Sequence, residues 1–139
     1  MVDELDIKII VAMDNDPNAS IEQVAKFAGV SKGTVRNRIM KLKKEQIVIG
    51  NGLKVKWRAL GMDEVYLGLD IMPELYLKVL DSVKEFDFVK KLFSTSGDHS
   101  AIAYIVAESS KINDYISKID GINGVKKTYP AFVTNIIKY

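Results

Sequence analysis

A capped amphipathic helix with a basic outer face, placed directly after another short helix and a glycine turn, constrains this chain most. Ser31 to Glu45 reads SKGTVRNRIMKLKKE, and Val35, Ile39 and Leu42 recur at i, i+4 and i+7 behind the favoured N-cap residue Ser31. This spacing predicts a helix with one buried stripe. The opposite face carries Gly33, Asn37, Met40, Lys41 and Lys44, flanked by Thr34, Arg36 and Arg38.

The segment before this helix supplies the rest of a helix-turn-helix pattern. Ser20 to Ala28 is a second short amphipathic stretch, with Ser20 and Gln23 at capping-box spacing, and it ends at Gly29. A basic helix by itself is often only a solvated face, but this order is typical of a unit whose second helix enters the DNA major groove. We expect double-stranded DNA to contact Ser31, Lys32, Thr34, Arg36, Asn37, Arg38, Lys41 and Lys44.

Within that set the chemistry suggests two roles. Arg38 and Lys41 are predicted to contact phosphates, which gives affinity without sequence preference. Asn37 and Thr34 lie near the helix N-terminus and are predicted to read base edges.

The charge distribution divides the chain into two parts. Between Ser31 and Arg58 nine basic residues face one acid, Glu45, a local net charge of +8, whereas from Gly61 onward nine lysines face eleven acids, a net −2. The polyanion partner should therefore bind the first half, because the second half would repel a phosphate backbone.

Composition excludes several classes of protein. The 139 residues are 47% hydrophobic and 27% charged, which is typical of a soluble globular chain. Without cysteine, and with His99 as its single histidine, the sequence offers no disulfide, thiolate nucleophile or multi-histidine metal site, so we expect no cofactor and no metal. The acidic start MVDELDIKII and the lack of a long apolar run predict a cytoplasmic, nucleoid-associated protein without a membrane partner.

The periodicity predicts an α+β chain. Residues 1–48 should form a three-helix, winged-helix-like DNA-binding domain that begins with a helix at Asp3 to Met13. Residues 49–62 should form a linker strand or hairpin, because Leu53, Val55 and Trp57 alternate with basic residues around the Gly50-Asn51-Gly52 turn. This basic strand is either a wing that touches phosphates or an ordinary solvated strand.

Residues 63–139 change to a β-α-β-β-α-β order, that of a ferredoxin-like plait. Strands are predicted from Asp63, over 88–95, over 101–107 and over 125–138, where Pro130 should mark a bulge or an edge. Helices are predicted to begin at Pro73 and at Ser109 or Ser110, and the second should stop at Gly121.

The plait leaves one sheet face without helices, and that face is apolar. Its residues are Tyr66, Met72, Ile102, Tyr104 and Val106. An uncovered apolar face marks an interface, so we expect a homodimer formed sheet to sheet. The alternative is that the N-terminal helices cover it.

Several stretches resemble the Lrp/AsnC (feast/famine) family of prokaryotic transcription regulators. They are LDIKII, VSKGTVRNRIMKLKKEQIVIG, LGM and TSGDHSAIAYIVAES, and together they run along the whole chain. The most specific are Ser31, Val35, Arg38, Ile39 and Leu42, followed by Ile47 to Gly50. The resemblance implies a helix-turn-helix domain joined to an oligomerising plait, dimers that assemble into octamers, and an amino-acid effector.

In that family the effector commonly binds the loop between the second and third plait strands. By resemblance this loop is Ser96, Gly97, Asp98, His99 and Ser100. The family commonly has Gly-Asp-Tyr-Asp there, so in this chain His99 replaces a phenol and Ser100 replaces a carboxylate. The effector is therefore open: the loop binds another small molecule, binds an amino acid more weakly, or binds nothing. His99 is alternatively a loop histidine without function.

The sequence thus predicts a sequence-specific transcription regulator that responds to an amino acid or a related metabolite, and not an enzyme. One alternative is a sequence-tolerant architectural protein that coats DNA, which comparison of random with selected DNA at matched salt would separate. Another is an enzyme that resembles the sirohaem decarboxylases, which share the two-domain architecture, with His99 as the candidate residue.

Overall fold

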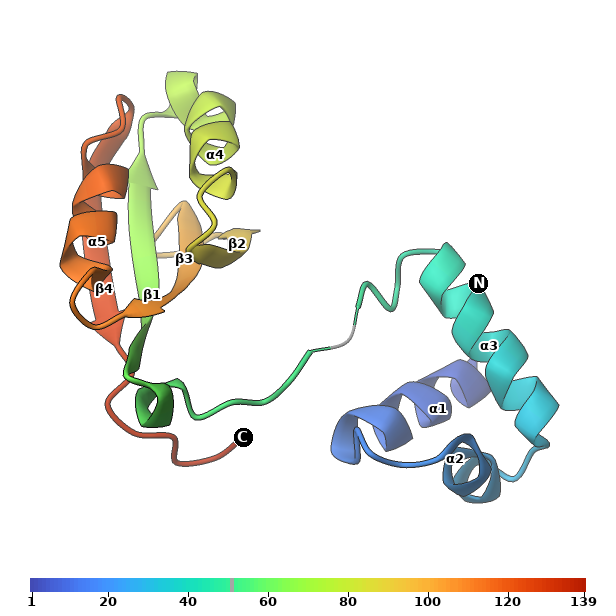
Figure 1. Ribbon diagram of the computed structural model, residues 1–139. Coiled ribbons are helices and arrows are strands. Elements are labelled where there is room, and N and C mark those ends of the chain that lie inside the picture. Colours follow the sequence, from blue (N-terminus) through green and yellow to red (C-terminus); the bar gives the residue numbers. More distant parts are fainter. Residues whose placement is uncertain (51) are drawn as a thin grey trace. The chain divides into compact units, whose positions relative to one another are not determined.

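The computed structural model describes residues 1–50 and 52–139 and divides into two compact units, Met1–Leu53 and Lys54–Tyr139 (Figure 1). The helices α1, α2 and α3 are the regular elements of the first unit, and the second unit holds every strand that the structure describes. None of the described helices combines the length and the apolar character needed to cross a membrane.

The N-terminal unit contains the three helices expected from the sequence. They are α1 (Glu4–Asn15), α2 (Ile21–Ala28) and α3 (Lys32–Lys44). Their N-caps are Asp3, Ser20 and Ser31, and the first two form complete capping boxes that satisfy free N–H groups at the helix start. Gly29 ends α2 in the left-handed conformation with φ 71°, which glycine adopts without strain. The three helices bury Ile9, Val24, Ala25 and Val35 between them.

The predicted hairpin between the two units is wrong for the described residues. Residues 46–50 and 52–56 carry no strand, Trp57–Leu60 form the 3-10 helix η1, and Asn51 of the expected turn lies outside the described residues. Leu53 is 91% exposed, so the alternation that suggested a half-buried strand has no apolar surface to pack on.

The C-terminal unit is the expected plait. Its elements are β1 (Met62–Ile71), η2 (Pro73–Leu75), α4 (Tyr76–Lys84), β2 (Val89–Ser94), β3 (Ala101–Glu108), α5 (Ile112–Asp120) and β4 (Val125–Phe132). The sheet order is β2-β3-β1-β4 with all pairs antiparallel. The β-α-β-β-α-β order predicted from periodicity is therefore confirmed.

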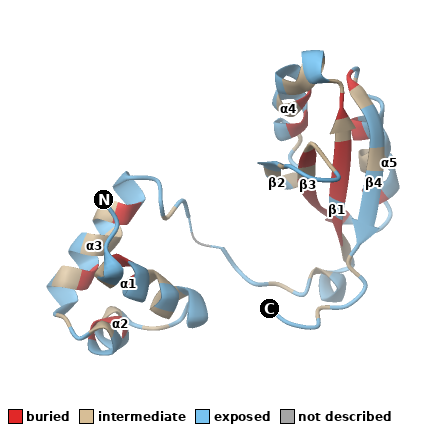
Figure 2. Cartoon of the chain, turned by 180° about the vertical axis from the view of Figure 1, so that it is seen from behind, coloured by how far each residue is buried: buried red, intermediate tan, exposed pale blue. Residues whose placement is uncertain are grey.

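Helices α4 and α5 cover one face of this sheet, and the buried strand residues lie beneath them (Figures 1 and 2). The core consists of alternate strand residues and the inner faces of the two helices: Val65, Leu67, Leu69, Ile71, Val79, Val83, Ala101, Ala103, Ile105, Ala107, Ile112 and Ile119. Two boundaries differ from the prediction. Helix α5 begins behind Lys111 without a side-chain cap, and β4 ends at Phe132. Pro130 lies opposite Leu67 in β4, an edge strand, as expected.

The second face of the sheet is less open than predicted. Tyr104 is 8% and Val106 is 3% exposed within a single chain, whereas Tyr66 is 48% exposed. Tyr104 packs on the Tyr66 ring at 4.9 Å, donates its hydroxyl to Glu64 and lies beneath the Lys91 ammonium at 5.5 Å. Within a single chain Tyr104 and Val106 are therefore already buried, and Tyr66 is the most exposed residue of the predicted interface.

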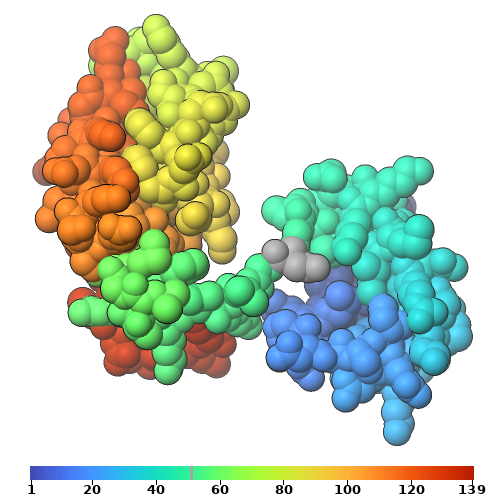
Figure 3. All heavy atoms as spheres, in the orientation of Figure 1, coloured from blue at the N-terminus to red at the C-terminus, as the bar shows by residue number. Residues whose placement is uncertain are grey.

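The C-terminal residues help to close that face. The Val133 N–H donates to the Glu64 carbonyl at 2.9 Å, and Arg58 Nη1 donates to the Thr134 carbonyl at 3.2 Å. The Tyr139 hydroxyl donates to the Val55 carbonyl at 3.3 Å. In Figure 3 these last residues (red) lie against the green segment that holds η1.

Candidate nucleic-acid interface

Helix α3 carries a group of exposed basic residues. Lys32, Arg36, Asn37, Lys43 and Lys44 are exposed. Among the described residues none of the four cations has a carboxylate within 4 Å. Because these cations lie on one helix, their positive potentials add, and this favours binding of a polyanion.

Ser31 and Thr34 set the position where α3 begins. The Ser31 hydroxyl oxygen accepts the Thr34 N–H at 3.1 Å, and the two hydroxyls are hydrogen-bonded to each other at 2.9 Å. Thr34 is half-buried. The hydroxyls therefore fix the helix N-terminus, and the base contact predicted for Thr34 would have to share its hydroxyl with Ser31.

Arg38 and Lys41, which were predicted to contact phosphates, are half-buried and form ion pairs with carboxylates at the start of α1. Arg38 Nη1 reaches Asp3 Oδ2 at 2.5 Å and Asp6 Oδ1 at 3.2 Å, and Lys41 Nζ reaches Asp6 Oδ2 at 3.4 Å. Lys41 also donates to the Met1 carbonyl at 2.8 Å. The charge of both cations is already balanced within the unit, so they brace α1 against α3.

Asp6 is the centre of this network. It is fully buried, and it accepts hydrogen bonds from the Asp3 N–H, Arg38 and Lys41. Burial alone would raise its pKa, but these hydrogen bonds outweigh burial and the net pKa is lowered. The Arg38 guanidinium, followed by the Asp6 N–H, lowers the pKa of Asp3 to about 2. Both carboxylates are thus held in their charged form.

Sequence periodicity identified the helix but not the boundaries of its exposed arc. Lys43 is exposed although the predicted contact set omits it, whereas that set includes the half-buried Arg38 and Lys41. The feature that separates them is the acidic pair of the N-cap Asp3 and Asp6 in the first turn of α1, which forms ion pairs with Arg38 and Lys41. A helix with two packing partners buries a wider arc than one apolar stripe indicates.

The predicted effector loop is partly committed to structural contacts. The Ser100 hydroxyl donates to the Leu69 carbonyl at 3.2 Å and accepts the Ile71 N–H at 3.1 Å, so it joins the loop to β1. Ser96, Gly97 and Asp98 are exposed, and Gly97 has φ 107°, a conformation that favours glycine. Asp98 supplies the carboxylate of this loop, and it has no cation within 4 Å in the described part of the chain.

The His99 side chain packs on the sheet and is half-buried. Its ring lies over Gly68, with Nδ1 3.4 Å from Asp70 Oδ1 and its centroid 4.7 Å from that of Tyr129. The imidazole closes the gap left by a strand residue without a side chain. This assigns His99 a packing role, which the sequence alone did not indicate.

Comparison with known proteins agrees with this architecture. Residues 2–43 match the AsnC-type helix-turn-helix domain. The chain is 36% identical over 141 residues to the HTH-type transcriptional regulator LrpA of Pyrococcus abyssi, covering 99% of this chain and 100% of that one. Among solved structures, E. coli AsnC superposes with a TM-score of 0.72 at 24% identity, covering 100% of this chain and 96% of that one.

A Neisseria meningitidis transcriptional regulator in complex with L-Met also superposes, with a TM-score of 0.77 at 15% identity, covering 100% of this chain and 94% of that one. The two structural matches establish the fold, and the full-length sequence match establishes the relationship. With its helix-turn-helix unit and its plait both matched, the chain belongs to the Lrp/AsnC family of DNA-binding transcriptional regulators.

Proposed function

We propose that this protein is a sequence-specific regulator that inserts the exposed face of α3 into the DNA major groove. The observation that carries the proposal is the separation of cations on α3. Lys32, Arg36, Lys43 and Lys44 are exposed without carboxylate partners among the described residues, whereas Arg38 and Lys41 are half-buried and paired with Asp3 and Asp6. Solubility alone does not require that the exposed cations of a helix lack carboxylate partners while the half-buried ones have them.

Asn37 is the side chain on this face best suited to read a base. It is exposed, it lies within the first two turns of α3, and an asparagine amide can bond adenine through two hydrogen bonds. The flanking lysines supply phosphate contacts, which position the helix without specifying sequence.

Selection of bound duplexes from a random library, followed by affinity measurements at matched salt, tests this proposal. Asn37→Ala should cost about 1–3 kcal/mol on the selected site and little on a scrambled duplex. Lys44→Ala should weaken both duplexes and reduce the salt slope by about one. Lys8→Ala, an exposed cation on α1, serves as the control and should change neither. Equal affinity for selected and scrambled DNA would instead favour the architectural alternative.

The plait is proposed to dimerise the chain through what remains exposed of its second face. Tyr66 is 48%, Phe93 is 49% and Tyr129 is 38% exposed, and they lie around the half-buried Ile102. A dimer would present two copies of α3 to adjacent half-sites. Light scattering should show that Tyr66→Glu yields folded monomers, whereas Leu77→Glu, at an apolar residue on α4 that is more exposed than Tyr66, leaves the mass unchanged. Monomeric parent protein would exclude this interface.

The 96–100 loop is proposed to bind an amino-acid effector. Asp98 offers a free carboxylate to a ligand ammonium, and the structurally similar Neisseria regulator was crystallised with L-Met. A thermal-shift screen of the twenty amino acids should find a stabilising ligand whose effect is lost in Asp98→Ala and kept in Asp114→Ala, an exposed control on α5. A shift that persists in Asp98→Ala would place the effector elsewhere.

A further inference from the structure

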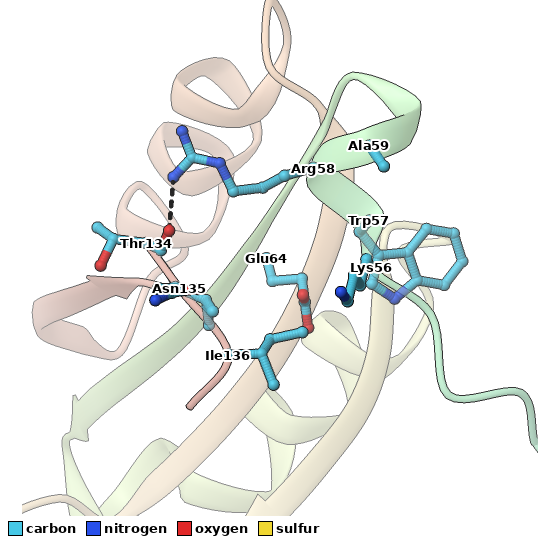
Figure 4. A pocket seen from close by; sticks show the side chains of 9 residues that line it. Lys56, Trp57, Arg58, Ala59, Glu64, Thr134, Asn135 and Ile136 are labelled. Carbon is cyan, nitrogen blue, oxygen red and sulfur yellow. Dashed lines mark hydrogen bonds between the residues drawn. The ribbon is translucent and has the colours of Figure 1, made fainter. Parts of the chain in front are cut away.

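A pocket of about 190 Å³ lies between η1, the start of β1 and the C-terminal residues (Figure 4). Its walls include Lys56, Trp57, Arg58, Glu64, Asn135 and Ile136. The hydrogen bonds from Val133 to Glu64 and from Arg58 to Thr134 hold the C-terminal segment in place as one wall. The pocket is therefore built by residues that are distant in sequence and fastened together.

The carboxylate of Glu64 is the unusual group in this pocket. Glu64 is only 5% exposed, and one of its oxygens, Oε2, accepts the Tyr104 hydroxyl. Burial, together with this hydrogen bond, raises the pKa of Tyr104, which keeps the phenol as the donor. The second oxygen, Oε1, has no donor among the described residues.

That second oxygen opens onto the pocket. Among the described residues, every side-chain oxygen or nitrogen that is fully shielded from solvent has a hydrogen-bond partner. Glu64 Oε1 has no such partner, so this oxygen must be accessible to solvent. Figure 4 shows the carboxylate between Ile136 on one side and Lys56 and Trp57 on the other. A largely buried carboxylate oxygen gains most from a charged donor.

The charges around the pocket restrict what the donor can be. Lys56 and Arg58 also line it, and neither has a carboxylate within 4 Å among the described residues. A simple cation would meet two positive groups, and a simple anion would meet Glu64. A molecule that carries both an ammonium and a carboxylate matches both signs.

Size and lining restrict the ligand further. The volume of about 190 Å³ is well below the roughly 300 Å³ or more of pockets that take drug-sized ligands. Trp57 and Ile136 offer apolar contact to a short side chain.

We propose that this pocket binds a small aliphatic amino acid, with its ammonium on Glu64, its carboxylate toward Lys56 and Arg58, and its side chain against Trp57 and Ile136. The site lies at the first residues of β1, whereas the 96–100 loop contacts the other end of that strand at Gly68 and Asp70. It is thus a second ligand site, independent of the loop proposed above.

Trp57 is the single tryptophan of the chain, so its fluorescence reports on this pocket directly. The probes are L-valine, isobutylamine, which lacks the carboxylate, and isovalerate, which lacks the ammonium. Titration of the full chain should change Trp57 emission saturably with L-valine and at least about tenfold more weakly with either truncated probe, because each loses a charge-assisted contact.

Variants then assign the groups. Glu64→Gln should weaken L-valine binding by about ten- to a hundredfold. Because loss of the buried carboxylate also perturbs folding, Lys56→Gln at the exposed rim is the second variant: it should weaken L-valine and leave the weak isobutylamine response unchanged. Asp98→Ala should leave the Trp57 response intact, which separates this site from the loop.

Three results would overturn the proposal. The first is emission that does not respond to L-valine in the millimolar range. The second is an equal response to L-valine and isovalerate. The third is emission that depends on protein concentration and not on L-valine, which would mean that a second copy of the chain fills the pocket.

Discussion

Gly68 is the position where a single methyl group tests the packing of the predicted effector loop. A Cβ at residue 68 would lie 2.6 Å from His99 Cδ2 and 2.7 Å from Nε2, closer than carbon atoms approach in proteins. Gly68→Ala must therefore push the imidazole away by about 1 Å to reach normal contact at about 3.5 Å. That shift also disturbs the contacts of His99 with Asp70 and Tyr129.

The expected magnitude follows from two opposing effects. Overpacking of this kind costs about 1–3 kcal/mol. Glycine inside a strand is itself unfavourable relative to alanine by about 0.5–1 kcal/mol, and Gly68 has no positive φ that alanine would resist. Gly68→Ala should therefore destabilise the parent chain but stabilise the His99→Ala variant, in which the ring is absent.

Urea unfolding followed by Trp57 emission measures this, because the tryptophan lies in the same compact unit as Gly68. For a unit of 60–100 residues each kcal/mol corresponds to about 4–8 °C in Tm, so thermal scans of the four proteins give an independent value. The reasoning fails if Gly68→Ala has the same sign and size in both backgrounds, since the His99 ring would then not be what occupies the space above the strand.

Three further predictions concern the two units separately. The pKa of Asp3 is about 2 in the folded chain against an ordinary 3.8, so the stabilisation that its carboxylate gives is full above about pH 4 and should be lost as pH falls toward 2. Far-UV circular dichroism should show this as a loss of helical signal, and the loss should be smaller in Arg38→Met. Leu42→Ala, at a fully buried position, should cost about 2–5 kcal/mol in the N-terminal unit, measured by the same helical signal in urea. Because the folded pKa of Tyr104 is raised above 10, stability should fall as pH rises above 10, and in Tyr104→Phe this alkaline loss should be smaller.

Local chemistry made the helices and strands predictable. Ser20 and Ser31 are capping residues in the sequence and caps in the structure, and the alternating apolar set of β1 is the set beneath α4 and α5. Leu53, Val55 and Trp57 alternate in the same way but form no strand, because periodicity reports which side chains could share a face and not whether a partner strand exists.

The contacts between segments that are distant in the chain could not be predicted from the sequence. Periodicity placed Arg38 and Lys41 on the outer face or its flank, but only the docking of α1 shows that Asp3 and Asp6 capture them. The same holds for Glu64, whose alternation in β1 gives no sign that Tyr104 and the C-terminal residues would enclose it. Residues whose role depends on tertiary neighbours were therefore the ones assigned least well.

Pro130 in β4 limits how this molecule can aggregate. Proline carries no N–H, so the edge strand β4 lacks one of the hydrogen-bond donors that a strand of another chain would need in order to extend the sheet. At the opposite edge, β2 carries Lys90 and Lys91, whose like charges would repel an identical strand aligned beside them. Both margins of the sheet are thus protected against uncontrolled fibre-like growth, which leaves face-to-face contact as the safer route by which copies of this chain can meet.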